Sequence, residues 1–153
     1  MDRLPARVTA LQPGPVSVQV QVTLPGGDVL CAVVTRESAT LLALAPGVAV
    51  VALPLTPGVL LSTGGVSPSA ETRWPATVAQ LAPGPLNTLV RLQTVRGTRI
   101  HAVLTHAAVA ELGLMAGAAV EVGILASQVM LAVPADAVSA PDANASVAWA
   151  RAR

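Results

Sequence analysis

The stretch Ala32-Val33-Val34-Thr35 decides the fold, because it returns 70 residues later as Ala102-Val103-Leu104-Thr105. The same offset relates Val59-Leu60-Leu61 to Val129-Met130-Leu131, and the register does not change along the chain. This period is longer than the roughly 20–50 residues of solenoid repeats. The sequence therefore indicates two tandem copies of one small domain.

The repeat divides the chain into four segments. We expect one domain over residues 1–62, a linker over 63–72, a second domain over 73–134 and a disordered Ala-rich tail over 135–153. A domain of ~65 residues is marginal in stability by itself. Because Cys31 is the single cysteine, no disulfide framework is available to stabilise it. With 53% hydrophobic residues, the chain is expected to bury part of its apolar surface between subunits.

Each copy shows the pattern of strands followed by one short helix. Residues 16–22 alternate apolar and polar side chains, which is typical of a half-buried strand. A Pro-Gly-Gly turn leads to a second, apolar strand over residues 29–34. Thr35 and Thr105 then stand where the N-cap of a short helix is expected, and each helix ends before a turn that contains glycine.

Further strands are predicted after each helix, over residues 48–53 and 59–62 in the first copy and over 120–125 and 129–133 in the second. Several short strands with one small helix and regular turns favour a small barrel of the oligonucleotide-binding (OB) type. The predicted fold class is therefore all-β, with two tandem five-stranded OB-like barrels, each carrying one short helix.

Several classes of function are disfavoured by the composition. The net charge is +1 and Phe and Tyr are absent, so neither the basic groove nor the aromatic platform of a nucleic-acid-binding barrel is expected. No nucleophile motif, phosphate loop or dinucleotide fingerprint is present, which argues against an enzyme. His101 and His106 lack nearby cysteines, and we expect no metal site there.

Membrane and export signals are also missing from the sequence pattern. The apolar stretch over residues 48–61 is interrupted by Pro54 and Pro57, and it falls short of the ~20 residues of a membrane span. No apolar run near Asp2 and Arg3 suits a signal peptide. We therefore expect a cytoplasmic protein without a membrane partner.

The motifs resemble those of the Mop domain, a branch of the TOBE superfamily. Residues 33–39, Val-Val-Thr-Arg-Glu-Ser-Ala, are similar to the helix-entry motif of that family, and residues 126–131 are similar to a later motif. The resemblance covers about residues 4–62 and 74–134. Two tandem copies resemble the di-Mop molbindins, which are small cytoplasmic proteins that bind molybdate and tungstate. The resemblance implies a homotrimer that holds these oxyanions at subunit interfaces and stores or buffers them.

A tetrahedral oxyanion requires convergent donors, and the backbone N–H groups at a helix N-terminus supply them together with the helix dipole. The candidate oxyanion-binding residues are Thr35, Arg36, Ser38, Thr105, His106, Ala126, Ser127 and Arg73. If one copy alone binds, the donors would come either from Thr105 with Ser127 or from Thr35 with Ser38. The two threonines are equally well explained as helix N-caps without a ligand.

The sequence also departs from the resembled family. The family usually opens each domain with Ser-Ala-Arg-Asn, whereas residues 69–72 read Ser-Ala-Glu-Thr. The family commonly has a Lys where this chain has Leu55 and Leu125. Arg3 and Arg73 could supply the missing cation from a shifted position, and the alternative is that both are solvated surface charges.

These departures leave other functions open. One alternative is a trimeric TOBE-type scaffold or partner-binding module with eroded anion sites. Another is a fragment that senses oxyanion for a separate transporter or transcription factor.

Overall fold

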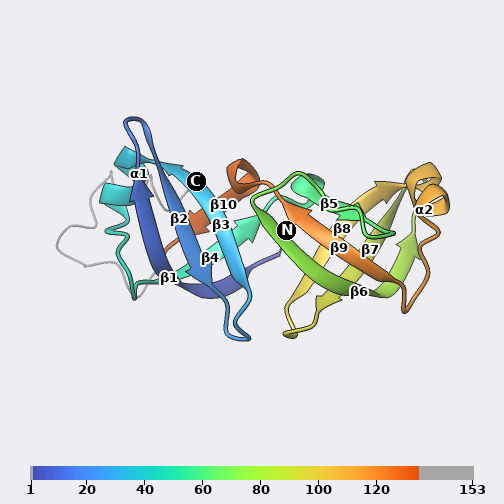
Figure 1. The fold of residues 1–153 in the computed structure, drawn as a ribbon. Helices are drawn as coiled ribbons and strands as arrows, with labels where there is room; N and C mark the ends of the chain where they lie inside the picture. Colours follow the sequence, from blue (N-terminus) through green and yellow to red (C-terminus); the bar gives the residue numbers. More distant parts are fainter. Residues whose placement is uncertain (1, 135–153) are drawn as a thin grey trace. The chain divides into compact units, whose positions relative to one another are not determined.

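The structure is a computed structural model that describes residues 2–134 (Figure 1). The predicted tail over 135–153 lies outside the described residues. Within the described part, strands dominate, with two short α-helices and two single turns of 3-10 helix. The strands form two five-stranded sheets, which confirms the predicted fold class. No helix in residues 2–134 combines the length and apolarity needed to cross a bilayer.

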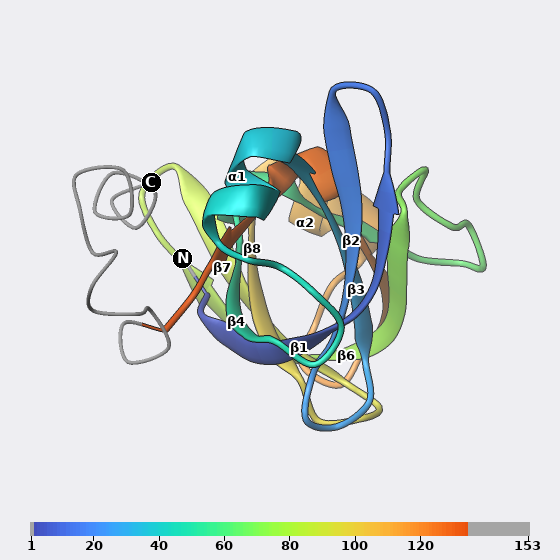
Figure 2. The same cartoon turned by 90° about the vertical axis from the view of Figure 1, so that its left-hand side faces the viewer.

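The first sheet has the strand order β10-β4-β1-β2-β3. Its strands are β1 (Leu4–Pro13), β2 (Ser17–Thr23), β3 (Val29–Thr35), β4 (Ala49–Pro54) and β10 (Val129–Ala132). Helix α1 (Arg36–Leu41) follows β3 directly, and the 3-10 turn η2 (Ala126–Gln128) precedes β10. Figure 2 shows α1 beside β2, at one end of the curved sheet.

The second sheet repeats this arrangement with the order β5-β9-β6-β7-β8. Its strands are β5 (Val59–Ser62), β6 (Thr72–Pro83), β7 (Asn87–Thr94), β8 (Arg99–Thr105) and β9 (Ala119–Ile124). Helix α2 (His106–Leu112) follows β8, and the 3-10 turn η1 (Thr56–Gly58) precedes β5. Three strand pairs of this sheet, β6 with β7, β7 with β8 and β6 with β9, are antiparallel. Antiparallel neighbours such as β6 and β7 can be joined by a short hairpin connection.

The two copies exchange their last strands. Strand β5 belongs to the first copy but pairs with β9 of the second, with Val59 opposite Ile124. Strand β10 belongs to the second copy but lies beside β4 of the first. The exchange is feasible because the duplication makes the two last strands equivalent, so either one fits either sheet edge.

The compact units of the structure therefore differ from the contiguous segments 1–62 and 73–134 expected from the repeat. One unit comprises Asp2 with Pro54–Leu125, and the other comprises Arg3–Leu53 with residues 126–134. A repeat in the sequence identifies what was duplicated, whereas strand pairing identifies what folds together. The physical reason for the difference is that the pairing of a sheet edge depends on long-range contacts.

The longest strands, β1 and β6, are not marked by the sequence patterns above. Residues 4–7 of β1 pair with β4, whereas residues 7–13 pair with β2, and the register shifts between Val8 and Ala10. The same shift occurs in β6 between Val78 and Gln80. Such a bulge bends a strand and interrupts the alternation of its side chains, which hides it from periodicity.

Aliphatic side chains form the core of each unit. Val20, Val22, Leu30 and Ala32 are fully buried in the first sheet, and their counterparts in the second are Val90, Leu92, Ile100 and Ala102. Trp74 is also buried, with 4% of its surface exposed. The alternation of buried and exposed side chains on β2 and β7 leaves the opposite face of each sheet to carry polar chemistry.

Candidate functional site

The junction of β3 and α1 holds three of the candidate residues. Thr35 caps the helix, because its Oγ1 accepts a hydrogen bond from the Ser38 backbone N–H at 3.0 Å. The same hydroxyl donates to Ser38 Oγ at 2.9 Å. Within residues 2–134, the Ser38 hydroxyl has no acceptor for its own proton. Thr35 therefore holds Ser38 Oγ at the helix start and leaves that proton for another acceptor.

The side chains at this junction are largely exposed and include the cation Arg36. Thr35 and Arg36 are exposed, and Ser38 is half-buried. Glu37 follows in the first turn, so the positive charge of Arg36 stands beside a carboxylate in the sequence. The backbone N–H of Arg36 donates to the Val16 carbonyl at 3.3 Å, which ties the helix start to the β1–β2 turn.

The junction of β8 and α2 has the same cap but fewer donors. Thr105 Oγ1 accepts from the Ala108 backbone N–H at 3.1 Å, so the predicted N-cap is confirmed here as well. Ala108 stands where the first copy has Ser38, so the first turn of α2 itself carries no hydroxyl. His106 is exposed, but its Nδ1 lies 3.1 Å from Oγ1 of the buried Thr88 on β7. This contact holds the imidazole toward the sheet.

The strand exchange decides which candidates share a unit. Turn η2, with buried Ala126 and exposed Ser127, lies against β3, so these residues belong to the same unit as Thr35 and Ser38. Turn η1 lies against β8 in the other unit, which contains Thr105. The alternative donor set of Thr105 with Ser127 is therefore divided between the two units. The candidates that belong to one unit are Thr35, Arg36, Ser38, Ala126 and Ser127.

Arg73 lies in the unit of Thr105 and occupies an exposed position on β6, opposite Gly123 of β9. A side-chain Cβ on Gly123 would come within 2.6 Å of Pro68 Cγ, so the end of the linker lies directly against β9. The sequence patterns described above do not predict this contact. A signal for it existed, because Gly123 replaces Leu53 at the corresponding position of the first copy.

Neither position of the family's Lys supplies a cation. Leu55 and Leu125 are both half-buried. A doubly charged oxyanion near either turn would therefore depend on hydroxyl and backbone donors and on arginines from elsewhere.

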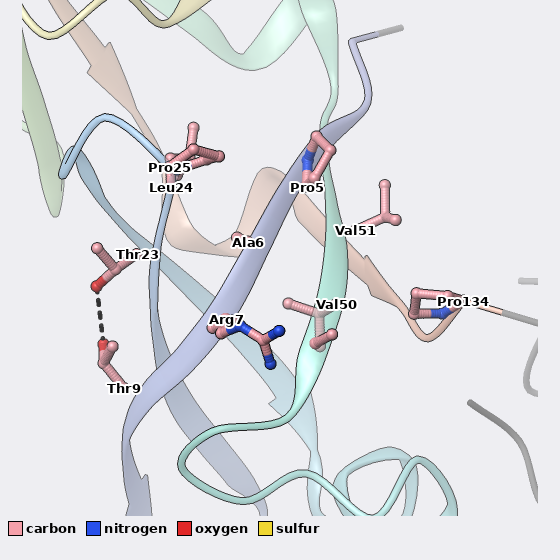
Figure 3. Close-up of a pocket in the computed structure, with 11 residues that line it drawn as sticks. Pro5, Ala6, Arg7, Thr9, Thr23, Leu24, Pro25, Val50, Val51 and Pro134 are labelled. Atoms are coloured by element: carbon pink, nitrogen blue, oxygen red, sulfur yellow. Dashed lines mark hydrogen bonds between the residues drawn. The ribbon is translucent and has the colours of Figure 1, made fainter. Parts of the chain in front are cut away.

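A separate hollow of about 560 Å³ lies over β1 and β4 (Figure 3). Figure 3 shows the Thr9 and Thr23 side chains joined by a hydrogen bond of 3.2 Å, at one side of the hollow. Arg7 also lines it, and its Nη1 donates to the Gly47 carbonyl at 3.0 Å. The other lining residues are apolar, namely Pro5, Ala6, Leu24, Pro25, Ala49, Val50, Val51 and Pro134. None of the candidate oxyanion-binding residues lines this hollow, and its apolar wall is unsuited to an oxyanion.

Comparison with protein families identifies two matches to the TOBE domain, over residues 2–61 and 68–131. Among curated proteins, the chain is 39% identical over 135 residues to the molybdenum-pterin-binding protein MopA of Rhodobacter capsulatus, covering 87% of this chain and 51% of that protein. It is 34% identical over 131 residues to the molybdenum transport protein ModE of Herbaspirillum seropedicae, covering 84% and 49%. The chain thus spans about half the length of these curated relatives.

Among solved structures, the fold is similar to that of the cytoplasmic molybdate-binding protein ModG in a form with molybdate bound. The TM-score is 0.82 and the sequence identity is 44%. The match covers 87% of this chain and 96% of that one. The likeness therefore extends over nearly the whole solved chain.

Proposed function

Because this chain belongs to the TOBE domain family, we propose that it binds molybdate as a cytoplasmic oxyanion-binding protein. The observation that carries the proposal is the 44% identity to molybdate-bound ModG across 96% of that chain. The curated relatives are named for binding or transport and not for catalysis. The proposed role is accordingly storage or homeostasis of the anion, without an enzymatic step.

The geometry of the β3–α1 junction supports a role as one half of the anion site. Ser38 Oγ offers a proton that no acceptor takes within residues 2–134, and Thr35 fixes the position of that oxygen. Exposed Arg36 adds a positive charge, and Ser127 on η2 adds a hydroxyl to the same unit. Hydroxyl and backbone donors in a turn suit a tetrahedral dianion such as molybdate or tungstate.

We also propose that the chain assembles as a homotrimer whose subunits complete the site. Val16 and Leu86 occupy equivalent turns in the two copies and are 79% and 81% exposed. Val33 and Val103 form a second equivalent pair, 38% and 40% exposed. Large aliphatic side chains at the same exposed positions of both copies favour burial against another subunit.

Isothermal titration calorimetry with molybdate, tungstate and sulfate tests the function. We expect micromolar or tighter binding of molybdate, of about −8 kcal/mol or more, and a loss of at least tenfold in Ser38→Ala. Thr40→Ala is the matched control, because Thr40 Oγ1 on the same helix donates to the Arg36 carbonyl instead. Ala108→Ser restores the missing hydroxyl in the second copy and is expected to tighten binding there. Equal affinities of Ser38→Ala and Thr40→Ala would remove Ser38 from the site.

The alternative function is a trimeric scaffold or partner-binding module with eroded anion sites. Half-buried Leu55 and Leu125 and the exposed carboxylate Glu71, all at positions where the family usually has cations, favour it. A folded trimer that gives no heat with any of the three anions would establish this alternative and refute the molybdate proposal.

A further inference from the structure

Polar and cationic side chains gather on the outer face of β6, β7 and β8. Arg91 and Gln93 alternate with buried residues on β7, and Arg99 and His101 do so on β8. In the register of the sheet, Arg91 lies opposite His101 and Gln93 lies opposite Arg99. Gln80 of β6 lies opposite Arg91 on its other side. These five residues, the cationic face, surround a hollow of about 410 Å³.

Hydrogen bonds hold part of this face in place. Arg91 Nη1 donates to Gln80 Oε1 at 2.9 Å, which orients the guanidinium along the sheet. Asp2 binds His101 twice, through the ring Nδ1 at 2.7 Å and the backbone N–H at 2.9 Å. The Arg99 guanidinium has no hydrogen bond or ion pair within residues 2–134. Neither arginine of the face is therefore neutralised by a carboxylate in the described part of the chain.

The corresponding face of the first copy carries no charge. The counterparts of the five residues, 70 positions earlier, are Ala10, Gln21, Thr23, Val29 and Cys31. Both sheets fold with the same strand order and the same bulge, so the fold does not require arginines at these positions. At these five positions the second copy carries arginines and the first copy does not, so the first copy serves as an uncharged control within the same chain.

We propose that the cationic face binds a small phosphorylated molecule. A guanidinium presents paired N–H donors that match the oxygens of a phosphate group. Arg91 and Arg99 are diagonal neighbours on adjacent strands, about 7–8 Å apart, so they engage two phosphate groups of one ligand. Gln93 adds an amide donor between them. A volume near 410 Å³ suits a small organic ligand, and the face covers the second and third strands of the barrel, where OB folds bind their ligands.

The composition of this face favours a small ligand over a nucleic acid. Barrels that bind single strands stack successive bases on aromatic side chains. The chain has no Phe or Tyr, and Trp74, the one tryptophan within residues 2–134, is 4% exposed, so the described part of the chain presents no Phe, Tyr or Trp ring for stacking. The ligand is therefore recognised through its charge and not through stacked bases.

Calorimetric titration of the full-length protein with inorganic tripolyphosphate tests the proposal, in buffer containing saturating molybdate so that oxyanion sites do not contribute. We expect one site per chain and at least a tenfold loss of affinity in Arg91→Gln/Arg99→Val, which installs the residues of the first copy. Arg96→Gln is the matched control, because it removes the same type of charge from the neighbouring β7–β8 turn and does not line the hollow. Its affinity is expected to stay within twofold.

A gain-of-function variant provides a second measurement. Gln21→Arg/Val29→Arg places both arginines on the first copy and is expected to raise the number of tripolyphosphate sites from one to two per chain. If Arg96→Gln lost as much tripolyphosphate affinity as Arg91→Gln/Arg99→Val, the effect would arise from net charge alone and the proposal would be overturned. The absence of tripolyphosphate binding, or tighter binding of a single-stranded oligothymidylate, would also overturn it. Because Arg91 and Arg99 are not among the proposed oxyanion-binding residues, a loss confined to their double variant is independent of the proposed oxyanion function.

Discussion

Val59 lies opposite Ile124 in an antiparallel strand pair, although the two residues belong to different copies of the repeat. This pair shows that each unit is completed by a strand from the other half of the sequence. The exchange also moves η2 and Ser127 into the unit of Thr35, and so determines which candidate donors belong to one unit. The geometry of the candidate site thus depends on the topology of the whole chain.

Disulfide trapping tests the strand exchange directly. Ser62 lies opposite Glu121, and both are half-buried. In a Cys31→Ala background, Ser62→Cys/Glu121→Cys is expected to form an intrachain disulfide under mild oxidation, because opposed residues in a strand pair fall within disulfide reach. Mass spectrometry of tryptic peptides measures the bond.

Ala132→Cys/Glu121→Cys is the matched control for this experiment. Ala132 occupies the position of Ser62 in the second copy, and it would oppose Glu121 if each copy folded as a contiguous unit. Exchange predicts no disulfide within the chain for this pair. The opposite pattern of cross-links would show contiguous domains.

Gly123 is expected to be intolerant of a side chain. Because a Cβ there would lie 2.6 Å from Pro68 Cγ, Gly123→Leu must displace the linker from β9. Overpacking of this kind costs about 1–3 kcal/mol, and thermal unfolding monitored by circular dichroism measures it. Adding Pro68→Gly to Gly123→Leu is expected to recover part of the lost stability. If the stability did not recover, the clash with Pro68 would not be its cause.

The contact of Asp2 with His101 is expected to stabilise the unit that contains β8. Asp2 is 14% exposed at its side chain and accepts from both the ring and the backbone of His101. Asp2→Ala is expected to lower the free energy of unfolding by about 1 kcal/mol, since the pair is partly solvated. Urea unfolding of Asp2→Ala, His101→Ala and the double variant yields the coupling energy, and a value near zero would contradict a specific contact.

Substitutions of Thr35 separate its role as a cap from its role in positioning Ser38. Thr35→Val removes the cap and is expected to cost about 1 kcal/mol of stability together with anion affinity. Thr35→Asn retains a good cap but removes the hydroxyl that donates to Ser38 Oγ. We expect Thr35→Asn to unfold near the wild-type temperature while binding molybdate more weakly. Wild-type affinity in this variant would show that the hydroxyl serves the helix alone.

Much of each unit was predictable because the signals are local. The alternation over residues 16–22 encodes β2, since every second side chain must face the core. Thr35 and Thr105 encode helix starts through contacts three residues away. The turns before β3 and β8 follow from Gly27 and Gly97, whose φ angles of 101° and 95° suit glycine.

The features that depend on contacts between residues far apart in the sequence were decided by the tertiary structure alone. The sequence repeat implies two equivalent last strands, and it contains no information on which sheet edge each one occupies. The bulge at Val8 hid β1, and the register of β6, β7 and β8 was needed to place Gln80, Arg91 and Arg99 on one face. Capping, turns and alternation involve neighbours along the chain, whereas strand exchange and the cationic face depend on hydrogen bonds between segments far apart in it. For that reason the sequence determined the repeat, the fold class and the helix-start donors, and the fold determined which of those donors lie together.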